Sequence, residues 1–428
     1  MLEMLQKIVA AFLTAAACLL PVTSSAQDSN SFARENQELR SRLDRLESFV
    51  DQLRLDASTT PSFESGISTI PTTENGPVAG RSVEHTSFST WNLHSALEGP
   101  PTFPTVRLTG FFQADAGWIH QDAVNMAAVG DVQDGTDFRR ARLAATGNVA
   151  ENVGYMLEMD FAFPGRPSFM DVWGEVRDLD VLQNVRFGQY RQPFGLDGLT
   201  SVKELTFLER GLPFAFLPFR QMGVMAHGTD AAEAMTWWLS GFRAPVDTFA
   251  GNVGDNGGYG LASRVTGVVM DDGAGSILHV GGAYSLIEPS SGTVRYRNQP
   301  EFFVSDSILG ATPFFVDTLA MATDHVNLFG GELAATSGAW HAQGEVIYAV
   351  VDRSAASTAT FSGASIQTGY ILTGEHRPYD GKNGVLGRIV PHENFGNSCA
   401  GAWEVAARWS YLDLNYGGIV SEPEVLRS

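Results

Sequence analysis

Long segments in which apolar and polar residues alternate are the feature that most restricts the fold of this chain. In residues 106–119, Leu108, Phe112 and Trp118 occupy one set of alternating positions, and Arg107 and Asp115 occupy the other. Successive side chains of a β-strand point to opposite sides of the sheet, so each such segment predicts a strand with one apolar and one polar face. A β-sandwich shows the same alternation, so strand length and the position of charges must decide the fold class.

Both criteria favour a membrane barrel. The alternating segments are about 9–14 residues long, as tilted membrane strands are, whereas strands of globular proteins are usually about 5–6 residues long. Charged residues lie in mid-strand but on one face only, as where Glu158 and Asp160 alternate with Leu157 and Met159. We therefore predict an all-β fold, a transmembrane antiparallel β-barrel of the outer-membrane type.

Thirteen segments are predicted as strands of this barrel. They are residues 106–119, 138–149, 153–163, 169–177, 185–192, 221–228, 234–242, 259–268, 276–287, 325–336, 339–351, 361–373 and 402–413. Bacterial single-chain barrels have an even number of strands. A further strand at residues 293–303 brings the number of strands to 14. It also keeps the long connectors, such as 121–137 and 193–220, together at the extracellular end.

The region before the barrel divides into three parts. Residues 1–26 have the short apolar stretch and small-residue cleavage site of a signal peptide, with cleavage expected after Ala26. A lipoprotein site at Cys18 is the weaker alternative. Residues 27–56 contain a 3.5-residue apolar repeat, which predicts a coiled-coil helix; an amphipathic helix lying on the barrel or the membrane is the alternative. Residues 57–105, rich in Ser, Thr, Pro and Gly, are predicted to be a flexible linker, and the barrel is assigned to residues 106–428.

Composition excludes several functions. The chain has 28 Lys and Arg against 48 Asp and Glu, a formal net charge of −20, which is unfavourable for binding nucleic acid. It lacks a Gly-x-Ser-x-Gly motif, a His-Glu-x-x-His motif and a Gly-rich phosphate loop with Lys, so no enzymatic activity is predicted. The nine His are scattered and one Cys remains after signal cleavage, so we expect neither a metal site nor a cofactor.

Several sequence blocks resemble the phosphate-selective porin O and P family of Gram-negative outer membranes. These blocks are residues 138–142 (FRRAR), 188–195 (GQYRQPFG), 205–210 (LTFLER), 372–377 (LTGEHR) and 401–415 (GAWEVAARWSYLDLN). The resemblance covers about residues 106–415 and is specific as a set. It implies a trimeric barrel of 16 strands, a third extracellular loop that folds inward to narrow the pore, and pore-facing arginines and lysines that conduct anions.

The chain departs from the family pattern in two respects. About two closing strands that family members have after the last block are missing, which indicates either a truncated product or a barrel that closes differently. Residues of the family's high-affinity phosphate site are not matched, so phosphate selectivity is not carried over.

The predicted strands and the family resemblance together indicate which residues line the pore. The inward loop falls on residues 193–220; its four phenylalanines favour folding into the lumen, with capping of the rim as the alternative. Arginines on the polar face either attract anions or brace the wall by pairing with Glu158, Asp160, Asp171 and Glu175. The pore-lining candidates are Arg140, Arg142, Arg186, Arg264, Arg295, Arg297 and Arg408, and the constriction-loop candidates are Lys203, Arg210 and Arg220.

The sequence thus predicts a porin of the Gram-negative outer membrane that passes small anions, phosphate among them, or hydrophilic solutes by passive diffusion. The expected partners are outer-membrane lipid, small anions and two further copies in a homotrimer. The alternative is a structural protein whose coiled coil anchors the outer membrane to the cell wall with little transport. An outer-membrane hydrolase is a distant third hypothesis.

Overall fold

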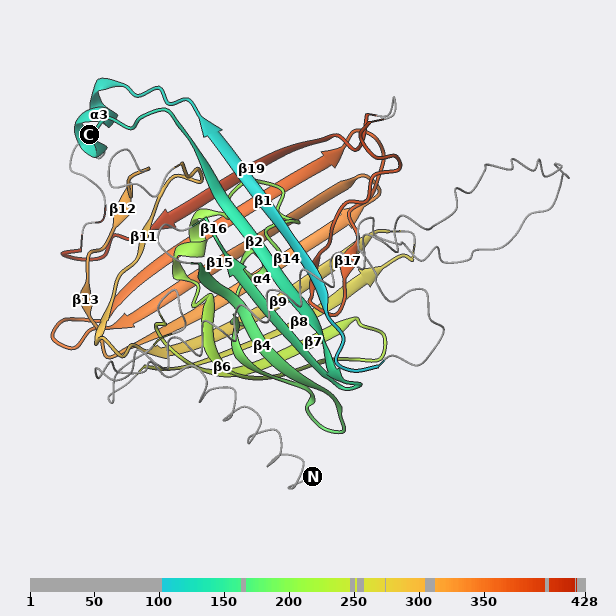
Figure 1. The fold of residues 1–428 in the computed structure, drawn as a ribbon. Helices are drawn as coiled ribbons and strands as arrows, with labels where there is room; N and C mark the ends of the chain where they lie inside the picture. Colours follow the sequence, from blue (N-terminus) through green and yellow to red (C-terminus); the bar gives the residue numbers. More distant parts are fainter. Residues whose placement is uncertain are drawn as a thin grey trace, which may run out of the picture. The chain divides into compact units, whose positions relative to one another are not determined.

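One large antiparallel sheet organises the part of the chain described by the computed structural model, which covers residues 102–162, 167–246, 251, 258–273, 275–304, 312–396, 400–419 and 421. The predicted signal peptide, coiled coil and most of the linker lie outside the described residues. The sheet has 13 strands, and each strand pairs with its neighbours in chain order. Figure 1 shows these long strands running at a common tilt in a curled sheet.

The strands of the large sheet are β1 (Arg107–Gly117), β2 (Gly135–Ala150), β3 (Val153–Asp160), β4 (Ser168–Leu179), β5 (Gln183–Arg191), β6 (Arg220–Thr229), β7 (Met235–Arg243), β8 (Tyr259–Asp271), β9 (Ile277–Glu288), β14 (His325–Ser337), β15 (Trp340–Asp352), β16 (Ala359–Ile371) and β19 (Glu404–Asp413). Short elements lie in the connectors: α3 (Ala123–Val129), α4 (Leu196–Leu199), η1 (Leu212–Phe216), β10 (Thr293–Val294), β11 (Arg297–Asn298), β12 (Val316–Asp317), β13 (Met321–Ala322), β17 (Tyr379–Asp380) and β18 (Val385–Leu386). No helix among the described residues is long and apolar enough to cross a membrane.

Alternation gives the sheet two different faces. Leu108, Phe112, Leu143, Val265 and Ile366 are exposed on one face, which we call the outer face. The opposite, inner face holds the buried charged residues and the inward-folded connectors. An exposed apolar face of this extent is what a lipid environment requires.

The predicted fourteenth strand at residues 293–303 is wrong. This segment forms the two-residue strands β10 and β11, which pair with β13 and β12 in separate small sheets. If it were extended, its even-numbered positions would form a mostly apolar face, but that face contains Pro300, which has no N–H to donate to a neighbouring strand. Tyr296, on the same face, is instead 5% exposed and packs with Phe216 and Phe361, so the segment stays in the connector between β9 and β14.

The edges of the sheet are β1 and β19, which are not hydrogen-bonded to each other among the described residues. The structure therefore shows an open sheet of 13 strands, whereas the sequence predicts a closed barrel. Strand direction alternates across the sheet, and β1 and β19 are its first and thirteenth strands, so they run in the same direction. By the same alternation, the connector 372–403 lies at the same end as the short turns 151–152, 180–182 and 338–339. We call this the short-turn end and the opposite one the long-connector end.

Candidate functional site

The connector between β5 and β6, residues 192–219, folds across the inner face of the sheet, and we call it the inner loop. Its first part is fixed to β5, because Arg191 Nη1 donates hydrogen bonds to the carbonyls of Leu199 (2.7 Å) and Thr200 (3.0 Å). Its far part reaches β16, where Phe216 is 2% exposed and packs in the same apolar cluster as Phe361. The inner loop thus crosses from β5 to the opposite strands instead of capping the rim.

Arg210 lies at the centre of the inner loop and is 9% exposed. Its Nε and Nη2 donate to the carbonyls of Asp197 (2.7 Å) and Thr200 (2.9 Å), and its guanidinium carbon lies 5.0 Å from the ring centre of Phe214 and 5.2 Å from that of Phe219. Burial lowers the pKa of Arg210 to about 9, so the side chain stays charged at neutral pH. Burial also raises the pKa of the Asp197 carboxyl.

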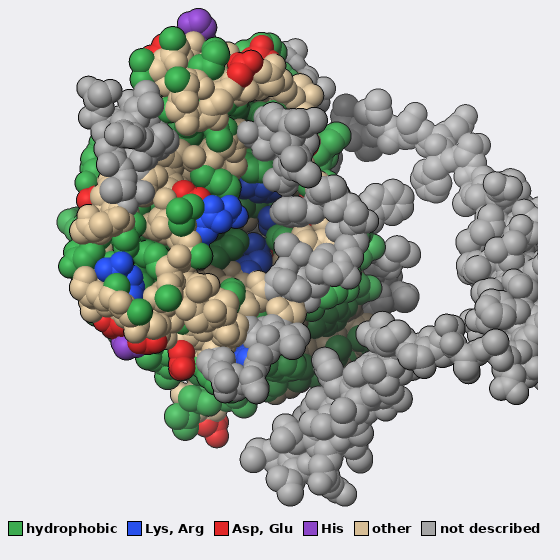
Figure 2. Space-filling view, turned by 90° about the vertical axis from the view of Figure 1, so that its left-hand side faces the viewer, with side chains coloured by type: hydrophobic (Ala, Val, Ile, Leu, Met, Phe, Trp, Pro, Cys, Tyr) green, Lys and Arg blue, Asp and Glu red, His purple; other side chains and the backbone are tan. Residues whose placement is uncertain are grey.

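A cavity of about 420 Å³ lies beside the inner loop, and we call it the arginine cavity. Figure 2 views the end of the sheet that carries α3 and β11 and shows a hollow with Lys or Arg side chains deep inside it. The charged residues that line the cavity are five arginines and three carboxylates: Arg139, Arg140, Arg142, Arg210, Arg220, Asp160, Glu209 and Glu301. The formal charge of its lining is therefore +2, against −20 for the whole chain.

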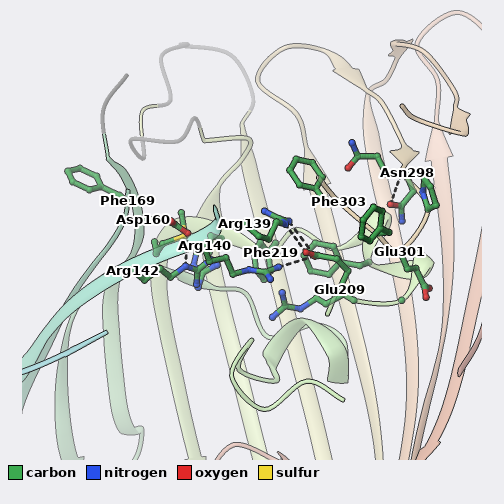
Figure 3. Close-up of a pocket in the computed structure, with 18 of the residues that line it drawn as sticks. Arg139, Arg140, Arg142, Asp160, Phe169, Glu209, Phe219, Asn298, Glu301 and Phe303 are labelled. Atoms are coloured by element: carbon green, nitrogen blue, oxygen red, sulfur yellow. Dashed lines mark hydrogen bonds and ion pairs between the residues drawn. The ribbon is translucent and has the colours of Figure 1, made fainter. Parts of the chain in front are cut away.

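A β-bulge brings two adjacent arginines to this cavity. The pairing of β1 with β2 shifts by one residue between Gln113 and Ala114, so that Gln113 lies opposite Arg140 and Ala114 opposite Phe138. The extra residue is Arg139. Such an insertion breaks the strict alternation of faces, and both Arg139 (2.7 Å) and Arg140 (2.9 Å) form ion pairs with Glu209 of the inner loop, as Figure 3 shows.

Other predicted arginines form ion pairs along the inner face, from the arginine cavity onward. Their partners are the strand carboxylates expected for bracing of the wall, so each positive charge is held in place by a negative one. The pairs are Arg142–Asp160 at 2.7 Å, Arg220–Asp171 at 2.9 Å and Arg186–Glu175 at 2.6 Å. This series extends from the arginine cavity toward the short-turn end, along β2 to β6.

The connector 372–403 also folds onto the inner face. Arg264 of β8 is 1% exposed and forms an ion pair with Glu332 of β14 at 2.5 Å. The same guanidinium donates to the carbonyls of Asn383 (3.1 Å) and Gly384 (2.7 Å), which belong to the connector. Glycine at position 281 makes room for this pair, because a Cβ there would lie 2.5 Å from Glu332 Oε1.

Two further contacts fasten the same connector. His279 of β9 bonds to Glu332 (3.0 Å) and to the hydroxyl of Tyr379 in β17 (2.8 Å). Arg377 donates to Thr206 Oγ1 (2.5 Å) and to a backbone carbonyl of the inner loop. Two segments, one from each end of the sheet, therefore meet inside and narrow the space over the inner face.

The remaining predicted residues are spread over several places. Arg408 of β19 pairs with Glu301 and donates to the carbonyl of Glu209 (2.7 Å), so it lies on the inner face near the arginine cavity. Arg295 and Arg297 lie in the connector between β9 and β14, where Arg295 pairs with Asp317. Lys203 is exposed on the inner loop, and Arg220 is the first residue of β6.

Sequence reasoning missed three contributors to this site. Alternation alone assigns Arg139 to the outer face, and the bulge that turns it inward depends on the partner strand. Glu209 and Glu301 come from connectors, where no periodicity predicts direction. The described residues contain no group of three or more His, Cys, Asp or Glu side chains placed to share a metal ion.

An antiparallel sheet with an apolar outer face, a charged inner face and inward-folded connectors around a polar cavity defines a protein of the porin class. The chain belongs to the phosphate-selective porin O and P family, whose model matches residues 106–422. This family and fold indicate a channel rather than an enzyme, and they place the protein in the outer membrane of Gram-negative bacteria.

Individual relatives are distant. An uncharacterized protein of Caulobacter vibrioides is 28% identical over 432 residues, covering 96% of this chain and 84% of its own length. Among solved structures, the anion-selective porin from Comamonas acidovorans is 12% identical, with a TM-score of 0.40 over 64% of this chain and 76% of its own. The OmpT outer membrane protein of Vibrio cholerae is 9% identical, with a TM-score of 0.32 over 72% and 99%.

Proposed function

We propose that this porin lets small anions, phosphate among them, diffuse passively through the space inside the sheet, with the arginine cavity as the site that favours anions. The observation that carries the proposal is the composition of that cavity, in which five arginines face three carboxylates. Clusters of Arg or Lys in a narrow pore attract anions and repel cations. The net charge of −20 opposes this only weakly, because exposed charges farther away than about 10 Å are screened by salt.

Not every donor in the cavity is used by the protein. Nη1 of Arg210 and Nη1 of Arg220 make no hydrogen bond to the described residues, although both side chains line the cavity. Guanidinium donors suit the oxygens of phosphate and carboxylate. A passing anion would exchange water for these two donors, while the paired arginines keep their positions.

The proposed path runs from the long-connector end, which we assign to the outside of the cell, past the inner loop and the connector 372–403. Because two inward segments narrow it, only small hydrophilic solutes are expected to pass. Assembly as a homotrimer is proposed on the family resemblance.

Changing one charge in the arginine cavity should shift ion selectivity in a direction set by its sign. Arg139→Gln should lower, and Glu209→Gln should raise, the permeability ratio of chloride to potassium by at least about twofold each. A unit charge at roughly 8 Å contributes about 0.5 kcal/mol even in bulk water. Reversal potentials in planar bilayers measure the ratio.

Asp413→Asn, at the end of β19 and not among the cavity-lining residues, is the matched control and should leave the ratio unchanged. Equal ratios in wild type, Arg139→Gln and Glu209→Gln would contradict the assignment of selectivity to this cavity.

A second function is favoured by one sequence feature, the heptad repeat over residues 32–53, which suits a periplasmic coiled coil that attaches the outer membrane to the cell wall. Deleting residues 32–53 distinguishes the two proposals. Under the porin proposal solute uptake falls or stays unchanged while the envelope remains attached. Unchanged uptake with a loosened envelope would favour the anchor.

A further inference from the structure

Phenylalanine side chains form part of the wall of the arginine cavity, beside its charged groups. Five of them line it: Phe169 of β4, Phe214 and Phe219 of the inner loop, and Phe302 and Phe303 of the connector between β9 and β14. The last four are only half-buried, whereas Phe216 of the same inner loop is 2% exposed and belongs to the core. Apolar surface in a cavity gains free energy when an apolar group covers it, and neither chloride nor phosphate carries such a group.

One of these residues, Phe219, has an unusual backbone conformation, with φ +48°. A bulky side chain in this left-handed region is rare and costs free energy, and such residues concentrate at binding sites. The ring centre of Phe219 lies 4.8 Å from the guanidinium carbon of Arg220 and 5.2 Å from that of Arg210. Phe214 meets the same ring edge-on at 4.8 Å. The strained residue therefore lies where aromatic and cationic side chains of the cavity meet.

The same two arginines carry the donors that the protein leaves unused. Nη1 of Arg210 and Nη1 of Arg220 make no hydrogen bond to the described residues, whereas the carboxylates of the cavity lining are bound by other arginines. Guanidinium donors suit the oxygens of a carboxylate. A further ring, that of Phe303, lies 4.3 Å from the guanidinium carbon of Arg139 (Figure 3). The cavity thus offers donors for a carboxylate and aromatic surface for the group attached to it.

The size of the cavity suits one ring with a charged group. Its volume is about 420 Å³, whereas an engineered apolar cavity of about 150 Å³ in another protein binds benzene. Sites for small organic molecules begin at about 300 Å³. An anion the size of benzoate can therefore enter together with some water.

We propose that the arginine cavity favours small organic anions that carry an aromatic ring, of which benzoate is the simplest. This inference rests on the proposed function, because it names a class of anion for the same cavity. The carboxylate replaces water at the unused donors of Arg210 and Arg220, and the ring covers the exposed surface of the phenylalanines. Aromatic rings also gain from edge-to-face or offset contacts beyond the area that they bury. Acetate, which has the carboxylate but no ring, makes only the first of these interactions.

Block of the chloride current by added anions tests this preference, since an anion that stays in the cavity keeps chloride out. The purified full-length protein is recorded in a planar bilayer at neutral pH, where benzoate and acetate are both ionised. In the wild type, the half-blocking concentration of benzoate should be lower than that of acetate by at least about fivefold. Phe219→Leu and Phe303→Leu keep an apolar side chain but remove a ring, so each should reduce this difference by at least about twofold. The block by acetate should stay as in the wild type, which shows that the donors are still in place.

Phe329→Leu is the matched control, because Phe329 lies on the outer face and does not line the cavity; it should keep the full preference for benzoate. Equal half-blocking concentrations of benzoate and acetate, in a wild type whose zero-current potential has the sign set by chloride, would overturn this inference alone. So would a preference that persists undiminished in both Phe219→Leu and Phe303→Leu. A potential of the sign set by potassium would overturn the proposed function, and this inference with it.

Discussion

Replacing Arg264 with methionine is expected to destabilise the protein by about 3–5 kcal/mol and to increase its conductance. Methionine removes the charge that compensates Glu332, which is buried with it at 2.5 Å, and leaving one partner of a buried ion pair alone costs about that much. The same change removes the two hydrogen bonds that hold Asn383 and Gly384. The connector 372–403 would then leave the inner face and widen the path. Denaturant unfolding and single-channel recording measure the two effects.

Two further variants separate charge from geometry in this test. Arg264→Lys keeps the positive charge but loses the planar fork that contacts Glu332 and the connector together, so an intermediate effect is expected. The double variant Arg264→Met with Glu332→Gln should recover part of the stability, because no uncompensated carboxylate remains. Its conductance should stay high. Wild-type conductance and stability in Arg264→Met would show that the connector is held by other contacts.

Replacing Phe216 with alanine is expected to cost about 3–5 kcal/mol and to free the far part of the inner loop. Phe216 is 2% exposed, and its ring lies 5.0 Å from that of Tyr296 in an edge-to-face contact. Its cluster also includes Phe361 of β16 and joins the loop to the wall. Losing it should raise both the mean conductance and the current noise in bilayer recordings.

Phe329 offers a matched control of the same residue type. It lies on β14 with 49% of its surface exposed on the outer face, away from the inner loop. Phe329→Ala should therefore leave conductance and noise unchanged. If Phe216→Ala behaves like Phe329→Ala in the recordings, the inner loop does not limit the path.

The large sheet could be predicted from the sequence because its physical cause is local. Each of the 13 predicted segments overlaps one of the 13 strands, since alternation within a strand is sufficient to identify it. The additional strand at residues 293–303 was inferred from an expected even count rather than from alternation, and it is absent from the sheet. Arg295 and Arg297, two of the pore-lining candidates, lie in the connector between β9 and β14.

The site was less predictable because its main contacts join distant parts of the chain. Arg140, Arg142 and Arg264 follow the alternation and lie on the inner face, whereas Arg139 reaches it only through a bulge defined by pairing with β1. The connector 372–403 is held on the inner face by Arg264 and His279, which lie more than 90 residues away in sequence. No pattern within the connector itself specifies this.

The central claim, that the arginine cavity makes this porin favour anions, is tested most directly by one measurement. The purified wild-type protein is inserted into a planar bilayer, and the zero-current potential is recorded across a tenfold gradient of potassium chloride. A potential of the sign set by chloride movement is predicted, since five arginines against three carboxylates line the cavity. A potential of the sign set by potassium movement would contradict the account.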